Sequence, residues 1–396
     1  MSGPVAPTIP EEVLEIARIL AEAGYEAWCV GGALRDALLG HPHSDFDFAT
    51  SATPAQVTAL FRRTAPVGEK YGTVGVLDRL RVVHEVTTFR RDVTSDGRHA
   101  VVAYGVSLDE DLARRDFTIN AIAYHPLRHE WRDPFGGRAD LERGVLRAVG
   151  IPAERFREDY LRILRGIRFA ARFGFVIEPA TWAAAVEAAP GLAQLSAERV
   201  RDEWFKGLRT ARSVPQLVEL WTRSGAAERW MPELEVVPAD RIARAGSVAP
   251  ERRDPVLLTA LLIDGAAAVL RRLRASNAEI ARAAAIAHGP AAPSGSDARA
   301  VRRWLATVGR AADDLLALYA LREGAEAPWT PAVYQARERR DPLVRGDLAV
   351  TGADLQALGA SGRRVGELLA ALLDRVLDDP SLNQRDSLLA LAREML

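Results

Sequence analysis

The sequence predicts an α/β domain over residues 1–140, followed by an all-helical portion over residues 141–396. Two observations indicate this division. Before residue 138, short segments of strand-like alternation are interspersed with helical patterns. After it, strand patterns fade and the helix formers Ala, Leu, Arg and Glu dominate to the end. A chain of 396 residues is too long for one hydrophobic core, and we expect roughly two to four domains.

The elements of the α/β domain follow from periodicity and from the glycines and prolines that flank them. Helices are expected at residues 11–23, 33–39 and 54–63. Strands are expected at residues 25–30, 45–49, 72–78, 81–89, 121–124 and 130–132. Residues 90–106 are polar and contain glycine, which predicts a loop.

In the helical portion, Pro, Gly and Ser cluster at four places, where we expect helices to break. These breaks are expected near residues 210–214, 245–255, 288–298 and 326–343.

The charge balance limits the ways in which the chain binds other molecules. The net charge is −1, so binding of nucleic acid would depend on local basic patches. Lysine occurs only at positions 70 and 206, so 50 of the 52 basic residues are arginine, whose planar fork suits phosphates and base edges. Residues 114–172 alone hold 13 arginines and 8 acidic residues.

Other compositional features favour a cytoplasmic location. The single cysteine, Cys29, excludes a disulfide framework and a cysteine zinc site. The N-terminus has no signal-peptide pattern, and the most apolar stretch, 257–270, is interrupted by Asp264 and is too short to cross a bilayer. We therefore expect no membrane association, and no pattern indicates a protein partner.

The first chemical signal is the pair Asp45 and Asp47. On a strand these carboxylates share one face, while Phe46 and Phe48 point into the core. Two carboxylates this close repel each other unless a divalent cation lies between them, and Mg²⁺ prefers carboxylates together with substrate phosphates. The sequence therefore indicates a site for phosphoryl-type transfer. A surface acidic strand is the alternative.

A phosphate site is indicated just before this pair. The glycine turn Gly31-Gly32 precedes a short helix, and backbone N–H groups at such a turn bind anions. Arg35, one turn into the helix, would add a phosphate contact, although it could instead pair with Asp36. No Gly-Lys-Ser or Gly-x-Gly-x-x-Gly motif is present, which disfavours ordinary NTPases and dinucleotide-binding proteins.

Two further segments could complete this site. Glu85 lies on a strand that could pair beside the aspartate strand, where it would be a third carboxylate for metal; an edge-strand glutamate is the alternative. Arg114, Arg115 and Asn120 suit contacts to a triphosphate and a ribose, because an asparagine amide can hold a sugar hydroxyl. A helix cap with solvated arginines would give the same pattern.

The segment Glu158–Arg162 bears on the choice of nucleotide. Cytosine and adenine present an amino donor beside a ring-nitrogen acceptor, whereas uracil and guanine present the reverse. An acceptor, Asp159, beside a donor, Arg162, would therefore match C and A and leave a buried charge unpaired with U or G. The alternative is an Asp159–Arg162 salt bridge within one helix.

These motifs together resemble one family. The chain is similar to the bacterial tRNA nucleotidyltransferases (CCA-adding enzymes) and poly(A) polymerases, in the class II group that also includes the eukaryotic CCA-adding enzymes. The motifs that carry the resemblance are Gly31–Asp36, Asp45–Asp47, Arg114–Ala121, Asp133–Gly137 with Asp140 and Leu141, Glu158–Arg162 with Arg165 and Arg168, and Ser196–Lys206; a weaker likeness continues at Pro342–Leu348, Gly352–Leu355 and Val365–Gly366.

The resemblance implies a fold and a division into domains. A polymerase-beta-like nucleotidyltransferase head over residues 1–140 would be catalytic, and a helical neck over 141–210 would select the nucleotide. A helical body over 211–330 and a tail over 331–396 that binds tRNA would follow. It also implies magnesium as cofactor, and tRNA, CTP and ATP as partners.

The implied activity is template-independent addition of CCA to the tRNA 3′ end, with release of pyrophosphate. The segment Gly68–Thr73 looks more like CCA-adding members than poly(A) polymerases, and an intact loop at 90–99 disfavours addition of CC only. Addition of the terminal A only, poly(A) synthesis and a catalytically silent RNA-binding role stay open. The expected catalytic residues are Asp45, Asp47 and Glu85, with metal at Asp45 and Asp47; the expected nucleotide-binding residues are Gly31, Gly32, Arg35, Arg114, Arg115, Asn120, Asp159, Arg162, Arg165 and Arg168.

Overall fold

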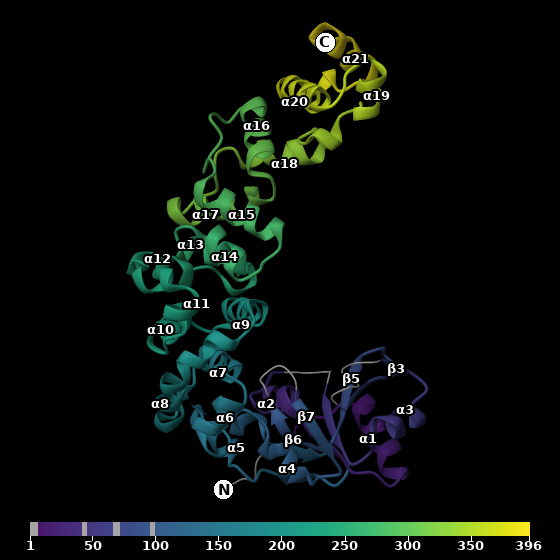
Figure 1. Cartoon of the computed structure of the whole chain (residues 1–396), viewed down its shortest axis with the longest axis vertical. Coiled ribbons are helices and arrows are strands. Elements are labelled where there is room, and N and C mark those ends of the chain that lie inside the picture. The colour runs from purple at the N-terminus through teal and green to yellow at the C-terminus, as the bar shows by residue number, and fades with distance from the viewer. Residues whose placement is uncertain (1–6, 42–45, 66–71, 96–99) are drawn as a thin grey trace. The chain divides into compact units, whose positions relative to one another are not determined.

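The computed structural model describes residues 7–41, 46–65, 72–95 and 100–396 (Figure 1). The chain divides into two compact units, the first ending at Val236 and the second comprising Val237–Leu396. Asp45, most of the segment Gly68–Thr73 and the tip of the 90–99 loop lie outside the described residues. The domain boundaries expected at 140, 210 and 330 stay predictions.

The first unit is built around a seven-stranded mixed sheet, with the order β3-β4-β5-β2-β1-β8-β9. Within it β2 and β5 run parallel, and the other neighbours are antiparallel. Its strands are β1 (Ala27–Val30), β2 (Asp47–Thr50), β3 (Thr64–Ala65), β4 (Thr73–Leu77), β5 (Val83–Thr88), β8 (Ala123–His125) and β9 (Glu130–Arg132). The expected strands are confirmed; β3 was missed because two residues give no detectable alternation.

Four helices precede or connect strands of the sheet along the chain. They are α1 (Glu11–Glu22), α2 (Gly31–Leu38), α3 (Pro54–Leu60) and α4 (Leu108–Ala113). The expected helices over 11–23 and 54–63 are confirmed within a few residues. Helix α2 begins two residues earlier than expected, because Gly31 itself adopts a left-handed φ of 78° and so lets the helix start directly after β1.

The loop expected over residues 90–106 is wrong for most of its length. Strands β6 (Arg90–Ser95) and β7 (Ala100–Tyr104) pair antiparallel as a separate two-stranded ribbon. The polar composition suggested a loop, but β-branched residues on both arms favour extended backbone, and pairing satisfies the backbone N–H and C=O groups.

The rest of the first unit is helical, as expected, apart from one short parallel pair. Its helices are α5 (Gly137–Arg143), α6 (Pro152–Glu158), α7 (Leu161–Phe173), α8 (Pro179–Ala188), α9 (Ala197–Thr210), α10 (Val214–Arg223) and α11 (Ala226–Trp230), and the pair is β10 (Val145–Leu146) with β11 (Val176–Ile177). Helix α7 packs against α9, and the fully buried Trp204 and Trp221 meet edge to face at 5.2 Å between α9 and α10. This core fixes α7, which carries several expected site residues.

The second unit is entirely helical in its described residues. Its helices are α12 (Ala239–Gly246), α13 (Pro255–Leu262), α14 (Ala266–Arg272), α15 (Asn277–His288), α16 (Ala298–Val308), α17 (Ala312–Glu323), α18 (Thr330–Glu338), α19 (Gly352–Ala357), α20 (Arg363–Asp378) and α21 (Arg385–Met395). The breaks expected near 210–214, 245–255 and 288–298 are confirmed. The break expected over 326–343 is wrong in its centre, where Pro331 starts α18 in its first turn.

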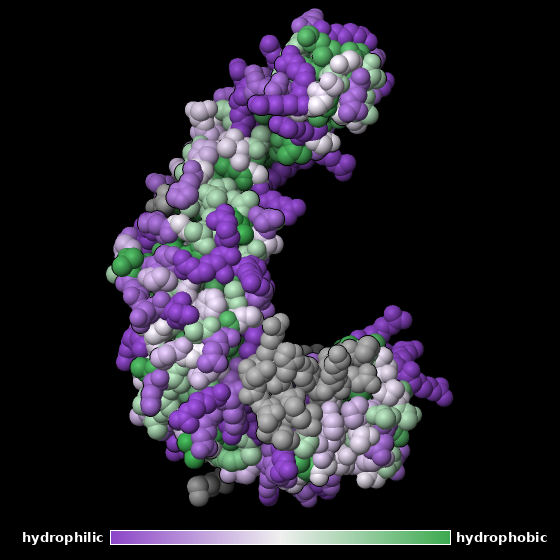
Figure 2. All heavy atoms as spheres, viewed as in Figure 1, coloured by the Kyte–Doolittle hydropathy of each residue, from purple (hydrophilic) through white to green (hydrophobic). Residues whose placement is uncertain are grey.

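The C-terminal helices of this unit share a core that includes Leu355, Leu372 and Leu388. Arginines on α16 tie α20 to the rest of the unit, since Arg299 and Arg303 both bind Asp378 at 2.7 Å. Figure 2 shows hydrophilic residues spread over the visible face of both units. None of the helices in the described residues combines the length and the apolar character that a bilayer crossing requires.

Candidate active site

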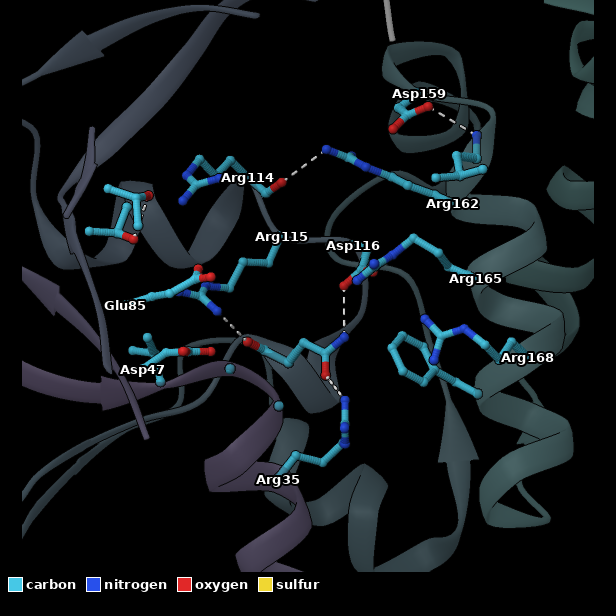
Figure 3. Close-up of a pocket in the computed structure, with 18 of the residues that line it drawn as sticks. Arg35, Asp47, Glu85, Arg114, Arg115, Asp116, Asp159, Arg162, Arg165 and Arg168 are labelled. Atoms are coloured by element: carbon cyan, nitrogen blue, oxygen red, sulfur yellow. Dashed lines mark hydrogen bonds and ion pairs between the residues drawn. The ribbon is translucent and has the colours of Figure 1, made fainter. Parts of the chain in front are cut away.

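A cavity of about 660 Å³ lies in the first unit between the sheet and helix α7 (Figure 3). This volume falls within the usual range for small-molecule sites. Among the described residues that line it, nine are arginines and four are acidic. The cavity is therefore suited to an anionic ligand, with carboxylates confined to a few positions.

The sheet wall of the cavity carries Asp47 and Glu85. The parallel register pairs Phe48 with Val86, so Asp47 and Glu85, one residue earlier in each strand, are neighbours on one face. Figure 3 shows both side chains directed into the cavity. Strand β5 is an interior strand of the sheet, so the alternative of an edge-strand glutamate for Glu85 is wrong.

The packing beneath this wall follows the expected alternation. Phe46 and Phe48 are both 0% exposed, which anchors β2 and turns Asp47 toward the cavity. Asp45 lies outside the described residues, so its pairing with Asp47 stays a prediction.

The donor set of the sheet wall suits a hard divalent cation. Asp47 and Glu85 supply carboxylate oxygens, which are the ligands that Mg²⁺ prefers. Within the described ranges no group of three His, Cys, Asp or Glu residues is close enough to hold a metal ion. The two described carboxylates fit the expected ion, and the third expected ligand is Asp45.

Gly31 allows a charged pair to approach the backbone. A Cβ at this position would lie 3.3 Å from Asp47 Oδ2 and 3.5 Å from Arg115 Nη1. The left-handed φ of Gly31 also disfavours any other residue. Gly31 and Gly32 both line the cavity, and binding of an anion by this turn stays a prediction.

Arg35 is buried and fully engaged by protein groups. It donates to Asp36 Oδ1 at 2.8 Å and to Asn120 Oδ1 at 2.6 Å. Its guanidinium also lies over the rings of Phe169 and Phe173, at 4.9 and 4.8 Å from their centroids. Burial lowers the pKa of Arg35 below its ordinary value. The alternative pairing with Asp36 is therefore what the structure contains, and a direct phosphate contact stays a prediction.

Asp116 is a buried acceptor that the sequence reasoning did not assign to the site. It accepts hydrogen bonds from Arg165 at 2.7 Å, from Asn120 Nδ2 at 2.9 Å and from the N–H of Phe117 at 2.9 Å. Burial disfavours its ionised form, but the charge of Arg165 and the hydrogen bonds from Asn120 and Arg165 outweigh burial and hold the pKa at about 2. Asp116 thus stays charged and aligns both Asn120 and Arg165.

Arg114 and Arg115 are also held by a carboxylate that was not expected. Asp111, which is 1% exposed, binds Arg114 at 3.0 Å and Arg115 at 3.3 Å. Burial raises the pKa of Asp111, but Arg115 and Arg114 outweigh it and keep the pKa below its ordinary value. The alternative of solvated arginines is wrong, because their side chains are only 18% and 17% exposed. The i,i+3 and i,i+4 spacing from Asp111 is the signal that could have identified it.

Asp159 and Arg162 do not lie within one helix, and the alternative of a salt bridge between them is wrong. Asp159 has extended backbone, with φ −157°, and separates α6 from α7. Its carboxylate accepts the N–H of Leu161 at 3.0 Å, which caps α7, and binds Arg199 at 2.7 Å. Arg162 binds Glu158 at 2.6 Å instead. Both side chains nevertheless line the same cavity (Figure 3).

Helix α7 presents a row of arginines, each matched to a carboxylate. Arg165 binds Asp116 at 2.7 Å, Arg168 binds Glu203 at 2.6 Å and Arg172 binds Asp36 at 2.8 Å. The ring of Phe169 supports this row, with Arg168 4.2 Å from its centroid. Spacings of three and four residues place the row on one helix face, and continuing the pattern past Arg168 would have identified Arg172. The cavity also includes Arg90 and Arg199, which the sequence reasoning did not assign.

Comparison with known proteins agrees with this fold. A family model described as the poly A polymerase head domain matches residues 27–147, and one described as the probable RNA and SrmB-binding site of polymerase A matches residues 174–237. The CCA-adding enzyme of Streptococcus suis is 48% identical over 212 residues, and that of Geobacillus stearothermophilus is 46% identical over 214 residues. These alignments cover 50% and 53% of this chain, and the chain spans about half of the length of these relatives, 52% of each.

A solved structure matches over a longer range. The crystal structure of the Bacillus stearothermophilus CCA-adding enzyme in complex with CTP is 34% identical, covers 97% of each chain and has a TM-score of 0.75. The architecture is a nucleotidyltransferase head followed by helices, as expected from the sequence. The chain belongs to the family of the CCA-adding enzymes.

Proposed function

We propose that this protein adds C, C and A to the 3′ end of tRNA, without a nucleic-acid template, from CTP and ATP. The observation that carries the proposal is that three groups of residues line one cavity. These are the carboxylates of the sheet wall, the arginines of α7, and the pair Asp159 and Arg162. A relative that is 34% identical over nearly its whole length is described as a CCA-adding enzyme in complex with CTP.

The nucleotide-transfer reaction takes place at the sheet wall. The 3′ hydroxyl of tRNA attacks the α-phosphate of the nucleotide, and pyrophosphate leaves. Asp45 and Asp47, with Glu85 beside them, would hold Mg²⁺, which neutralises phosphate charge and orients the attacking and leaving oxygens. The backbone of Gly31 and Gly32 at the N-terminus of α2 receives phosphate oxygens.

The nucleotide is held by the arginines of the cavity, several of which lie on α7 and form its helical wall. Arg114, Arg115, Arg165 and Arg168 bind the triphosphate, and their buried carboxylate partners fix them before the ligand arrives, which lowers the conformational cost of binding. Arg35 and Asp116 orient the amide of Asn120 toward the ribose.

Asp159 and Arg162 read the base. The carboxylate of Asp159 accepts the amino group of cytosine or adenine, and Arg162 donates to the neighbouring ring nitrogen. Because Arg199 and the N–H of Leu161 fix Asp159 from the protein side, the acceptor cannot readily turn away from a mismatched base. Uracil or guanine would then leave buried polar groups unpaired, which is the strong form of discrimination.

The test uses a tRNA transcript that lacks its CCA end, incubated with labelled CTP and ATP, singly and together. We expect addition of two C residues with CTP alone and of CCA with both nucleotides. No incorporation from any mixture would contradict the proposal. ATP addition only to tRNA that ends in CC would indicate an A-adding enzyme, and long adenosine tails on unrelated RNA would indicate a poly(A) polymerase. We infer a cytoplasmic location because tRNA, CTP and ATP are available there.

A further inference from the structure

The residue that follows Asp159 makes an unusually close contact on the side away from the nucleotide cavity. Tyr160 immediately precedes α7, and its ring packs on Gly191 in the short 3-10 helix Ala189–Gln194. A Cβ on Gly191 would lie 2.0 Å from Cε1 of the ring, 2.2 Å from Cζ and 2.4 Å from Cδ1. Any side chain at position 191 would therefore displace this ring.

The glycine is required by this contact and not by its backbone. The φ of Gly191 lies outside the left-handed region, so alanine could adopt the same backbone conformation. Within the described residues the hydroxyl of Tyr160 makes no hydrogen bond, so the ring is held by packing against groups such as Gly191. The Tyr160–Gly191 contact thus fixes the position of the turn between α6 and α7.

This turn carries both groups that face the base. Asp159 precedes Tyr160 and binds Arg199 at 2.7 Å, while the N–H of Leu161, which follows Tyr160, binds Asp159 at 3.0 Å. Arg162 lies in the first turn of α7, and its backbone N–H bonds to the carbonyl of Asp159 at 3.0 Å. A movement of the Tyr160 backbone would therefore change the spacing between the Asp159 carboxylate and the Arg162 guanidinium.

Space beside the ring allows such a movement without unfolding. A second cavity of about 200 Å³ is lined by Tyr160 and Gly191, together with Arg157 and Pro190. A ring displaced by a new Cβ could enter this cavity. A small side chain at position 191 would therefore shift the turn between α6 and α7 without unfolding the core.

We propose that Gly191, through Tyr160, is a positioning residue for nucleotide selection. It sets the separation of Asp159 and Arg162 from outside the nucleotide cavity, which it does not line. The proposal rests on the proposed function, in which these two side chains distinguish C and A from U and G.

The experiment is a double-mutant cycle on the full chain, with Gly191→Ala, Tyr160→Ala and the double variant. The readout is the ratio of the affinities for CTP and UTP, measured by calorimetry without tRNA. Gly191→Ala should lower this ratio about tenfold, because small misplacements of positioned groups have large effects. In the Tyr160→Ala background Gly191→Ala should have no further effect, because its Cβ no longer meets a ring.

Two variants serve as controls. Tyr160→Phe keeps the ring and should keep the wild-type ratio. Gly346→Ala, whose Cβ would meet nothing within 4 Å, should leave both the ratio and the urea midpoint unchanged.

The outcomes separate this proposal from the proposed function. A wild-type protein that binds CTP and UTP equally would contradict both. A selective wild type whose ratio is unchanged in Gly191→Ala, or effects that simply add in the double variant, would overturn the role of Gly191 alone. If Gly191→Ala fails to fold, Tyr160→Ala still tests the proposal. An unchanged ratio of the affinities for CTP and UTP in Tyr160→Ala would overturn it.

Discussion

The two walls of the cavity hold their charges in different ways. On the sheet wall Glu85 is exposed and makes no hydrogen bond or ion pair within the described residues. On the helical wall Arg165, Arg168 and Arg172 are each paired with a buried carboxylate. Glu85 therefore supplies a carboxylate that a cation could bind, whereas the helical wall presents cations whose positions are already fixed. In the proposed function, the sheet wall performs the chemistry and the helical wall recognises the nucleotide.

The largest effect is expected on the sheet wall, from Asp47→Asn. Loss of this carboxylate should lower nucleotide incorporation by about 10³-fold or more, because it would remove a ligand of the proposed catalytic metal. It should also weaken Mn²⁺ binding, measured by electron paramagnetic resonance without tRNA. The matched control is Asp202→Asn, an exposed aspartate of α9, which should change neither quantity. Activity near the wild-type level in Asp47→Asn would contradict a catalytic role for the sheet wall.

The next largest effect is expected behind the helical wall, from Asp36→Asn. Asp36 is 2% exposed and binds both Arg35 and Arg172, so its neutralisation leaves buried guanidinium charge without compensation. We expect the free energy of unfolding in urea to fall by about 3 kcal/mol. Arg223→Gln, which breaks the exposed pair with Glu219, should cost no more than about 0.5 kcal/mol. Equal costs for the two variants would show that the buried pairing does not hold this wall.

Nucleotide selectivity is the third test of the contrast between the sheet wall and the helical wall. Asp159→Ala and Arg162→Ala should each lower the preference for CTP and ATP over UTP and GTP by about 10²-fold, because each removes a polar group that is proposed to reject the wrong base. Mn²⁺ binding should be unchanged in both, since neither residue lies on the sheet wall. Glu154→Ala, at an exposed position of α6 that lines neither cavity, is the control. Continued rejection of UTP and GTP by both variants would exclude this pair as the base reader.

The smallest effect is a pH dependence that comes from Asp116. Its pKa is about 2 in the folded protein, against an ordinary value of 3.8. Because the folded pKa is the lower one, the ionised carboxylate stabilises the fold above the unfolded pKa, and this contribution is lost as the pH falls from about 4 to about 2. The stability difference between wild type and Asp116→Asn should therefore shrink by about 1 kcal/mol between pH 6 and pH 3. A difference that grows on acidification would contradict this pairing.

The sequence predicted the sheet wall better than the helical wall. Alternation in Phe46, Asp47 and Phe48 is a local signal, and a strand converts it directly into one buried face and one facing the cavity. The roles of Asp116, Asp36 and Glu203 depend on partners 35 to 136 residues away, and no local pattern encodes such pairs. The ribbon of β6 and β7 was missed for a related reason, since the pairing of its two strands with each other cannot be read from their polar composition.

The junction at Asp159 shows the same limit at shorter range. Asp159 and Arg162 both line the cavity, but they do not lie within one helix, as the salt-bridge alternative required. A side chain that caps the next helix competes with helix continuation, and the outcome depends on Arg199, 40 residues later. Family resemblance supplied the fold of the head, whereas the roles of the individual site residues stay predictions.

The separation of chemistry from recognition is tested most directly by titrating the Asp47→Asn variant with CTP, ATP, UTP and GTP in the absence of tRNA. If the two walls act as described, this variant no longer extends tRNA but still binds CTP and ATP in preference to UTP and GTP, with a ratio within about threefold of the wild-type value. Equal binding of all four nucleotides by Asp47→Asn, alongside selective binding by the wild type, would show that selection also depends on the sheet wall.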